Sequence, residues 1–385
     1  MTEPTDWNQL PDLAGRGLGG SVIAANDEFF AERENLIKPE DPVFRPHTFT
    51  NKGQEYDGWE TRRRRRDAGD HDWAIVRLGV PGVPSAVVVD TAFFAGNYPP
   101  FAQVEGTGLA GYPEAVDLAN AAWETIVPKS PLAGNTRNVF TVADASRYTH
   151  VRLRIFPDGG VARLRVHGTA VADPRWLADL PFDLAALANG GAVVGCSNWF
   201  FSPPNNMLQP GNSRNMGDGW ESARRRDNGH DWAVIRLATQ ALPRVLEIDT
   251  AHYKGNAPDR VRVHGIDARS ADLADEAAWW PVLPETRLQP DTNHRVRVRT
   301  DRPVTHLRLE VFPDGGIARF HVYGRLPEDG RKQLAANWFA TLPASHARSV
   351  LVRDCGLDES AAADLIATRP TLPPQVEALI DSLSS

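Results

Sequence analysis

Apolar and polar residues alternate with a period of two along several segments of the chain, as in strands that are buried on one face. In residues 151–156, valine, leucine and isoleucine alternate with two arginines and a phenylalanine, and residues 161–168 repeat the alternation. Pro-Asp-Gly-Gly separates the two segments at 157–160. Proline presets φ at the first position of a turn, and glycine accepts the positive φ that follows. The pattern therefore predicts a β-hairpin.

Two further segments, WAIVRL at 73–78 and VVVDTAFF at 87–94, are rich in β-branched residues and are expected to form two strands. Short strands separated by Gly/Pro-rich turns are typical of a β-sandwich or jelly roll. After Gly324 the sequence becomes rich in Ala and Leu with helical spacing, interrupted at Pro343, Gly356 and a Pro-Pro pair. This part of the chain is predicted to be a helical tail.

Three blocks of sequence occur twice, in the same order. Matching residues of the pairs lie 156 to 161 residues apart, and the third pair is identical at 13 of 20 positions. Such a period is the length of a whole domain, which favours two similar domains over a solenoid of short repeats. The pairs are Asp57–Leu78 with Asp218–Leu237, Val87–Asn97 with Leu246–Asn256, and Thr149–Gly168 with Thr305–Gly324.

The predicted fold is therefore mostly β, with two tandem pseudo-equivalent β-sandwich domains and a short C-terminal α-helical tail. A chain of 385 residues is too long for one ordinary core, which agrees with this division. The expected boundaries are an N-terminal extension at 1–12, repeat 1 at 13–170, a linker at 171–187, repeat 2 at 188–326 and the tail at 327–385.

The composition excludes several classes of function. A net charge of −7 argues against a protein that grips phosphate backbones, so no nucleic-acid partner is expected. The two cysteines, Cys196 and Cys355, form neither a disulfide framework nor a CxxC zinc site. The N-terminus has no secretory signal and no apolar run approaches ~18 residues, so we expect no membrane partner and a cytoplasmic location.

The densest polar constellation begins with Asp-Gly-Trp-Glu at 57–60, continues through arginines 62–66 and ends at His71. Carboxylates and histidine can transfer protons, and arginine can bind a carboxylate through two parallel hydrogen bonds. A structural interpretation is equally open, because the tryptophans suit a core and Asp-Gly suits a turn. The second copy has Ala223 where Arg62 falls, so a solvated loop edge explains the arginine run better than a nucleic-acid patch.

Asp-Thr at 90–91 and Gly-Asn at 96–97 recur in the second copy, at the end of a predicted strand. A turn alone explains Gly-Asn, while a carboxylate beside an amide at a strand end can also hold a ligand. The histidines are scattered, without HExxH spacing, so the sequence permits a divalent metal without indicating one. No metal ligands are assigned and no cofactor is expected to be required.

The repeated blocks resemble allantoicase, the ureide-degrading hydrolase also called allantoate amidinohydrolase. The resemblance covers about residues 10–325 and is carried by LPDLAGRGLGGSVIAANDEFFAERENLIKP, DGWETRRRRR followed by HDWAIVRLG, VVVDTAFFAGNYPP and FPDGGVARLRVHG, each with its second copy. It implies two jelly rolls of the galactose-binding-like type. It further implies hydrolysis of allantoate to ureidoglycolate and urea in purine catabolism, by a homo-oligomer.

Such a site needs a cation for the substrate carboxylate, partners for ureido N–H groups and an acid/base. The polar loop positions shared by both copies supply the candidates. Those expected to be catalytic are Glu60, His71, Glu221 and His230, and those expected to bind substrate are Asp57, Arg62, Arg63, Asp90, Asn97, Asp218, Arg224, Arg225, Asp249 and Asn256. The alternatives are a non-catalytic jelly roll that binds carbohydrate or another small ligand, and a structural oligomer scaffold.

Overall fold

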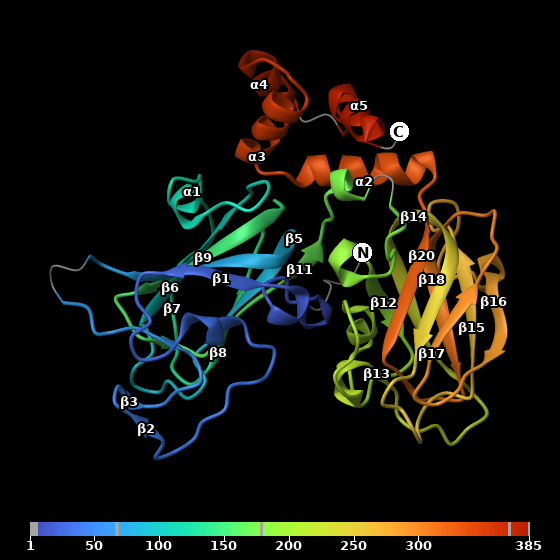
Figure 1. The fold of residues 1–385 in the computed structure, drawn as a ribbon, viewed down its shortest axis with the longest axis horizontal. Coiled ribbons are helices and arrows are strands. Elements are labelled where there is room, and N and C mark those ends of the chain that lie inside the picture. The colour runs from blue at the N-terminus through green and yellow to red at the C-terminus, as the bar shows by residue number, and fades with distance from the viewer. Residues whose placement is uncertain (1–6, 66–68, 178–179, 369–370, 384–385) are drawn as a thin grey trace. The chain divides into compact units, whose positions relative to one another are not determined.

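The computed structural model describes residues 7–65, 69–177, 180–368 and 371–383 (Figure 1). The chain divides into two compact units. Unit 1 comprises Met1–Thr169 and Thr341–Thr368, and unit 2 comprises Ala170–Ala340 and Arg369–Ser385. Each unit contains one copy of the repeated sequence, and each is described by itself.

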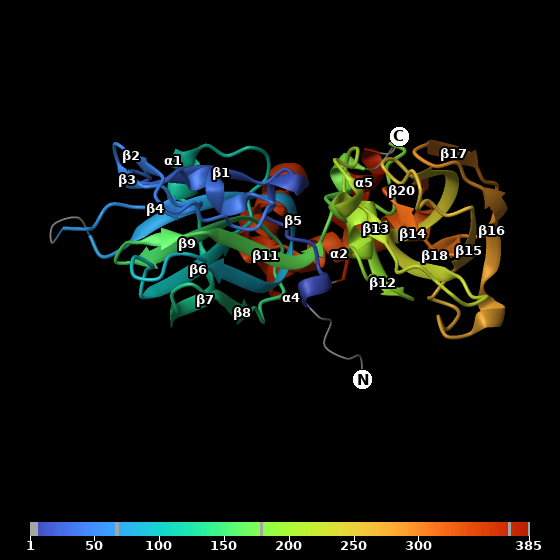
Figure 2. The ribbon, with the colours of Figure 1, turned by 90° about the horizontal axis from the view of Figure 1, so that it is seen from below.

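Unit 1 contains a seven-stranded antiparallel sheet within its described residues. The order β1-β5-β9-β6-β7 is extended by β8 and β11, which both pair with β5; Figure 2 shows β9, β6 and β7 side by side. Two short ladders, β4 with β10 and β2 with β3, lie apart from this sheet. The strands are β1 (Ser21–Ala25), β2 (Phe49–Thr50), β3 (Gly53–Gln54), β4 (Trp59–Glu60), β5 (Asp72–Asp90), β6 (Phe101–Thr107), β7 (Glu124–Pro131), β8 (Arg137–Thr141), β9 (Tyr148–Phe156), β10 (Gly160–Val161) and β11 (Arg163–Ala170). The helical segments are η1 (Trp7–Gln9), η2 (Arg16–Leu18), η3 (Arg33–Ile37) and α1 (Ala115–Ala119).

Strand β5 corrects one expectation, because the two predicted strands at 73–78 and 87–94 are one strand that ends at Asp90. Its register against β9 shifts between Arg77 and Gly82. Bulges and glycines bend a strand without ending it. The Gly- and Pro-rich residues 79–84 therefore form a bend within β5 and do not separate two strands. The N-terminal half of β5 pairs with β1 and β9, and its C-terminal half pairs with β8.

The predicted β-hairpin around Pro-Asp-Gly-Gly is wrong. Strand β9 pairs with β5 and β6, whereas β11 pairs with β5, and the residues after the turn form β10 on β4. The turn follows a cis Phe156–Pro157 peptide and leads the chain to a different strand partner. Gly159 has the positive φ that was expected, at 142°, but this conformation does not determine which strands pair.

Unit 2 repeats this architecture, including the cis Phe312–Pro313 peptide and the 19-residue central strand. Its described residues form a seven-stranded sheet in the order β12-β14-β18-β15-β16, extended by β17 and β20. The predicted mostly-β fold of two tandem repeats is confirmed. The strands are β12 (Ala192–Cys196), β13 (Trp220–Glu221), β14 (Asp231–Asp249), β15 (Arg260–Ile266), β16 (Trp280–Arg287), β17 (Asn293–Arg297), β18 (Val304–Phe312), β19 (Gly316–Ile317) and β20 (Arg319–Arg325); the 3-10 segments are η4 (Pro174–Trp176), η5 (Leu187–Asn189), η6 (Pro204–Leu208), η7 (Met216–Asp218) and η8 (Glu276–Ala278).

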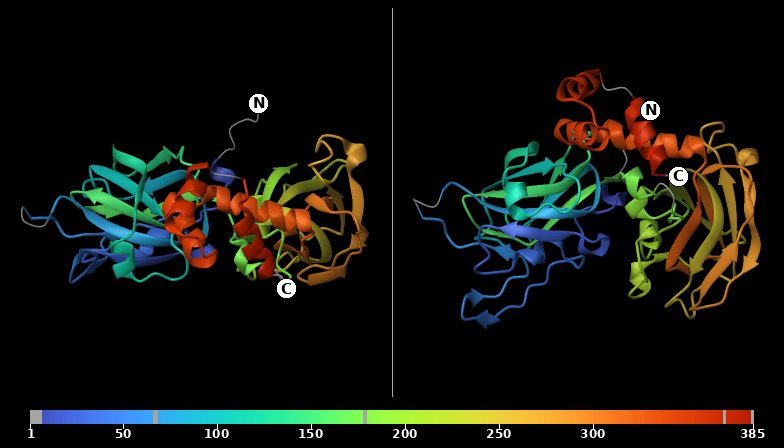
Figure 3. Two further views of the ribbon diagram at one scale, coloured as in Figure 1. Left: turned by 90° about the horizontal axis from the view of Figure 1, so that it is seen from above. Right: turned by 45° about the horizontal axis from the view of Figure 1, so that its top comes forward.

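The predicted C-terminal helices are also present, drawn in orange and red in Figure 3. Helices α3 and α4 belong to unit 1, while α5 and nearly all of α2 belong to unit 2. In unit 1 the Arg147 amide donates to Thr341 O at 2.6 Å, and in unit 2 the Thr239 hydroxyl donates to Gly330 O at 2.8 Å. No helix in the described part of the chain is long and apolar enough to cross a membrane. The segments are α2 (Glu328–Thr341), α3 (Ala344–Ser349), the π-helical turn η9 (Val350–Asp354), α4 (Glu359–Thr368) and α5 (Pro374–Ser382).

Candidate active site

The Pro-Asp-Gly-Gly turn of unit 1 holds three polar segments together through hydrogen bonds. Gly160 pairs with Glu60, and its N–H donates to the Asn97 carbonyl at 2.8 Å. The Asp158 carboxylate accepts from the Arg64 amide at 2.7 Å. We call these residues the junction of repeat 1; Glu221, Arg225, Asn256, Asp314 and Gly316 form the corresponding junction of repeat 2.

Each junction contains a carboxylate–amide pair. Asn97 Nδ2 donates to Glu60 Oε1 at 2.7 Å, and Asn256 Nδ2 donates to Glu221 Oε1 at 2.6 Å. Burial raises the pKa of Glu60 above its usual value, and the hydrogen bond from Asn97 offsets this only in part. A carboxyl group whose pKa is shifted toward neutrality is suited to proton transfer. Four of the residues predicted from sequence thus form two pairs.

The arginine four residues after each glutamate binds a buried aspartate. Arg64 is bonded to Asp72 Oδ1, which also accepts from Asn26 Nδ2 at 2.7 Å. The Asn26 side-chain oxygen in turn accepts from the Trp73 amide at 2.7 Å. Asp72 is 2% exposed, and its Oδ2 has no hydrogen-bond partner among the described residues.

Repeat 2 has the same arrangement with Arg225, Asp231 and Ser197. Arg225 Nη1 and Ser197 Oγ each lie 2.9 Å from Asp231 Oδ1. Sequence reasoning selected Arg225 but missed its counterpart Arg64, together with both buried aspartates. Aligning the two copies residue by residue places Arg64 opposite Arg225 and could have identified it.

The other predicted arginines are at the surface. Arg62 Nε contacts Asp27 Oδ2 at 2.6 Å while its side chain is 64% exposed. Arg63 and Arg224 are exposed and make no ion pair with any residue that the structure describes, which leaves them able to bind an anion. Arg66 lies outside the described residues.

Asp57 and Asp218 are bound to buried arginines. Arg163, 1% exposed, donates to Asp57 Oδ2 at 2.7 Å, and Arg319 donates to Asp218 Oδ2 at 3.2 Å. Burial disfavours the charged form of Asp57, but hydrogen bonds from Arg163 and Val43 lower its pKa below the usual value. These contacts stabilise the turn that precedes each Trp-Glu strand.

Asp90 and Asp249 end the long central strands. Each accepts a hydrogen bond at 2.8 Å from the amide two residues later, at Ala92 or Ala251. In repeat 1 the neighbouring Thr91 hydroxyl donates to Ala133 O at 2.7 Å. These bonds order the loop that carries the junction asparagine.

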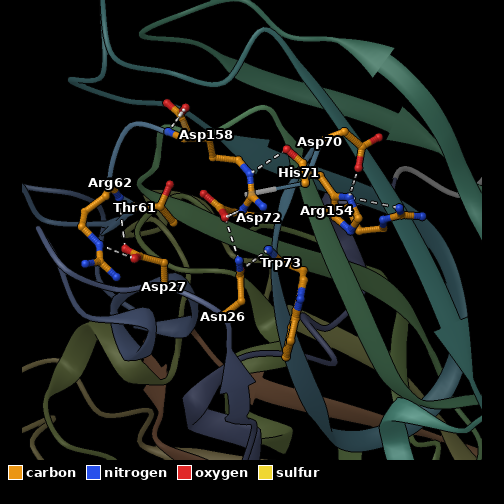
Figure 4. A network of polar contacts seen from close by, with 12 residues as sticks. Asn26, Asp27, Thr61, Arg62, Asp70, His71, Asp72, Trp73, Arg154 and Asp158 are labelled. Atoms are coloured by element: carbon orange, nitrogen blue, oxygen red, sulfur yellow. Dashed lines mark hydrogen bonds and ion pairs between the residues drawn. The ribbon is translucent and has the colours of Figure 1, made fainter. Parts of the chain in front are cut away.

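The predicted histidines belong to other polar clusters. His71 Nδ1 lies 2.6 Å from Asp70 and 3.3 Å from Arg154 Nη2 (Figure 4). His230 Nε2 lies 3.1 Å from Glu310, whose other oxygen is 2.6 Å from His264 Nδ1. Despite its burial, Glu310 has a pKa of about 2, because Arg262 and His264 hydrogen-bond to it. Neither histidine hydrogen-bonds to a junction glutamate within the described residues.

A metal site is not formed by the residues described here: none of their His, Cys, Asp and Glu side chains gather in threes or more in a way that could hold an ion. The expectation that no metal is required stays a prediction.

Comparisons with known proteins agree with the repeat architecture. A family profile for the allantoicase repeat matches residues 11–171 and again 182–327. A protein named probable allantoicase from Streptomyces coelicolor is 49% identical over 346 residues, covering 87% of this chain and 90% of the relative. Another from Nocardia farcinica is 51% identical over 325 residues, covering 84% and 96%. The crystal structure of allantoicase from Saccharomyces cerevisiae is 34% identical, with a TM-score of 0.70 over 82% of this chain and 93% of that one.

Proposed function

Because this chain belongs to the allantoicase family, we propose that it hydrolyses allantoate to ureidoglycolate and urea, a step of purine catabolism. The observation that carries the proposal is the Glu60–Asn97 pair, repeated as Glu221–Asn256 in a polar loop junction. The non-catalytic and scaffold alternatives are not favoured, because the matched relatives and structures are named for a hydrolase.

The reaction breaks one C–N bond at the central carbon of allantoate and forms a C–O bond there. The leaving ureido nitrogen must receive a proton, and the attacking water must lose one. A single carboxyl group can protonate the nitrogen and then, as the carboxylate, accept the proton from water. The products are one urea and one ureidoglycolate, so atoms and charges balance without a redox partner.

We assign the proton transfer in repeat 1 to Glu60. Its burial keeps part of the carboxyl population protonated closer to neutral pH, as an acid requires. Asn97 fixes the orientation of the carboxyl group through the 2.7 Å hydrogen bond. The exposed Arg63 is able to bind the substrate carboxylate, while Asp57 and Asp90 act as positioning residues of the surrounding loops.

Repeat 2 offers the equivalent set, with Glu221, Asn256 and Arg224 in these roles and Asp218 and Asp249 in the loops. His71 and His230 remain candidates for a second proton-transfer role. We propose repeat 1 as the main catalytic copy, because burial raises the pKa of the Glu60 carboxyl toward the range in which it can donate a proton.

We further propose a cytoplasmic homo-oligomer. Light scattering on the purified chain tests the assembly, and a mass equal to one chain would contradict it. Fractionation of the source cells tests the location.

The test of the activity is direct. Purified protein incubated with allantoate is expected to release one urea for each allantoate consumed, with the second ureido group retained in the product. A rate no higher than that of heat-denatured protein would contradict the proposal. Binding of a sugar without turnover would instead support the ligand-binding alternative.

A further inference from the structure

Repeat 2 presents three consecutive aromatic side chains to solvent, Trp199, Phe200 and Phe201, which we call the aromatic patch. They are 47%, 72% and 62% exposed, and the ring centres of the two phenylalanines lie 4.9 Å apart, edge to face. Their exposed parts add up to roughly 350 Å², since an aromatic side chain can bury about 150–250 Å². An apolar patch of this size on a globular protein often marks a contact surface.

Hydrogen bonds hold the aromatic patch in a fixed position. The patch follows β12, which is an edge strand of the main sheet of unit 2 (Figure 1). Before the patch, Asn198 Oδ1 accepts from the Ala223 amide at 2.7 Å, and Asn198 O accepts from Trp220 Nε1 at 2.9 Å. Within it, the Phe201 N–H donates to Glu221 O at 3.2 Å. Side chains on a segment that is already ordered lose less conformational freedom on binding, which favours association.

Repeat 1 has the same phenylalanine pair, Phe29 and Phe30, but charged residues surround it. Arg62 and Lys52 lie over the Phe29 ring, at 5.4 and 5.5 Å from its centre. Glu28 directly precedes the pair. The two phenylalanines are 42% and 40% exposed, less than their counterparts in repeat 2.

These charges are missing around the pair in repeat 2. Trp199 takes the position of Glu28, and Ala223 takes that of Arg62. Lys52 lies in a segment for which repeat 2 has no counterpart, since seven residues instead of seventeen lie between the shared proline and the Asp-Gly-Trp-Glu motif. Aromatic enrichment with depletion of charge is the composition of the centre of a protein–protein interface.

The lack of charge also indicates which partner fits, a second copy of the same surface. In a two-fold dimer one surface meets itself, so a charge near the axis faces a like charge. The aromatic patch avoids this repulsion, whereas Arg62 and Lys52 beside Phe29 would face their own copies. Two patches supply roughly 700 Å² of aromatic surface. A standard interface buries about 1,200–2,000 Å², so the patches provide its apolar centre and a polar rim provides the rest.

We propose that the aromatic patch of repeat 2 is a two-fold interface through which two copies of this chain assemble. The inference rests on the homo-oligomer of the proposed function and names its contact surface. Because Phe201 donates to Glu221, the interface lies next to the junction of repeat 2. Repeat 2 would then serve assembly, while the junction of repeat 1, with Glu60, stays outside the interface.

The experiment is the mass of the purified full chain, measured by light scattering over a range of concentrations. Phe200→Ser combined with Phe201→Ser is expected to raise the dissociation constant of the contact at least about 100-fold, because buried aromatics dominate interface energies. The matched control, Phe29→Ser combined with Phe30→Ser, is expected to leave the mass unchanged. All four side chains are exposed, so both variants are expected to fold, which thermal unfolding checks.

Cross-linking tests the two-fold geometry while most of the apolar surface is kept. Phe200→Cys is expected to couple to the same residue of a second copy through a short bismaleimide. The covalent dimer should exceed that of the wild type, in which Cys196 and Cys355 set the background. Phe29→Cys is the matched control and is expected to give no excess. Equal yields from the two variants would overturn the two-fold contact.

The outcomes separate the interface from the rest of the proposed function. A wild-type oligomer that Phe200→Ser with Phe201→Ser does not dissociate would overturn the interface alone. Equal dissociation of both double variants would also overturn it, because the contact would not be specific to repeat 2. A wild-type mass equal to one chain would overturn the interface and the homo-oligomer together, while urea release would still decide the hydrolase activity.

Discussion

The two repeats share their internal hydrogen bonds and differ at their surfaces. Both keep the glutamate–asparagine pair, the arginine bound to a buried aspartate, and the turn aspartate that accepts from that arginine's amide. The Asp27–Arg62 ion pair of repeat 1 has Asn198 and Ala223 at the same positions in repeat 2. What both copies retain is therefore the framework that orients the Glu-Asn pair.

The charged residues on the polar face of the main sheet differ more strongly between the two repeats. In repeat 1 Glu105 on β6 binds Arg152 and Arg154 on β9. In repeat 2 the positions of Glu105 and Arg154 are His264 and Glu310, so the carboxylate has moved to the neighbouring strand. This exchange of the acidic and basic positions keeps opposite charges in contact. The two repeats therefore do not require the same residue types on this face of the sheet.

The buried Arg163 gives the largest expected effect on stability. Arg163→Met removes one of the donors to the Asp57 carboxylate and the side-chain donor to several carbonyls, and breaking a buried pair of this kind costs about 3–5 kcal/mol. Arg319→Met is expected to cost a similar amount in repeat 2, because the two arginines make equivalent bonds. Guanidinium unfolding measures both.

A matched control is Arg137→Met, whose side chain is 66% exposed and should cost less than about 1 kcal/mol. A large loss in only one repeat would show that the two frameworks are not equivalent.

The second-largest expected effect is a loss of folding stability at acid pH. Burial, assisted by the charge of Arg77, lowers the pKa of His150 to about 4, and burial lowers that of His306 to about 4. Unfolded histidine titrates near ~6.5, so the unfolded chain takes up protons as the pH falls from ~6.5 to ~4 while the folded chain does not. Stability present above ~6.5 is therefore lost through this window, by about 3 kcal/mol at most for the 1%-exposed His150.

Unfolding free energies measured between pH 7 and pH 4 check this. His150→Gln is expected to flatten the profile more than His306→Gln, which is less buried. An unchanged slope in His150→Gln would contradict the assignment.

Substituting the turn aspartates, Asp158 and Asp314, tests how much their hydrogen bonds stabilise the two junctions. Asp158→Ala and Asp314→Ala each remove one hydrogen bond to an arginine amide, at a cost of about 1–2 kcal/mol. We expect similar losses of stability but a larger loss of urea release for Asp158→Ala, since repeat 1 is assigned the main catalytic role. Equal losses of activity would assign both junctions to catalysis.

The smallest effect is expected at the surface ion pair. Arg62→Ala should change stability by less than about 1 kcal/mol, because the arginine is largely exposed. Repeat 2 already has alanine at this position. A loss of several kcal/mol in thermal or guanidinium unfolding would show that Arg62 belongs to the framework.

The period-two patterns predicted where strands lie, because alternation is a local property of the sequence. The duplication predicted two similar folds in tandem, because the same blocks recur in the same order. The pairing of strands after Pro-Asp-Gly-Gly was not predictable, since it depends on Trp59–Glu60, about a hundred residues earlier. The alternation at 161–168 places Arg163 among the polar positions of its strand, yet its side chain is buried. Its partner Asp57 is 106 residues away in the sequence, so the local pattern does not reveal this contact. Glu60 and Asn97 were chosen separately as shared loop residues, and only the fold shows that they touch.

The central claim is that Glu60 transfers the proton during hydrolysis, and urea release by Glu60→Gln tests it most directly. Glutamine keeps the acceptor for Asn97 but cannot exchange the proton, so kcat is expected to fall about 100-fold or more with unchanged unfolding. Glu221→Gln, the matched change in repeat 2, is expected to retain most of the activity. A Glu60→Gln enzyme with wild-type kcat would contradict the account.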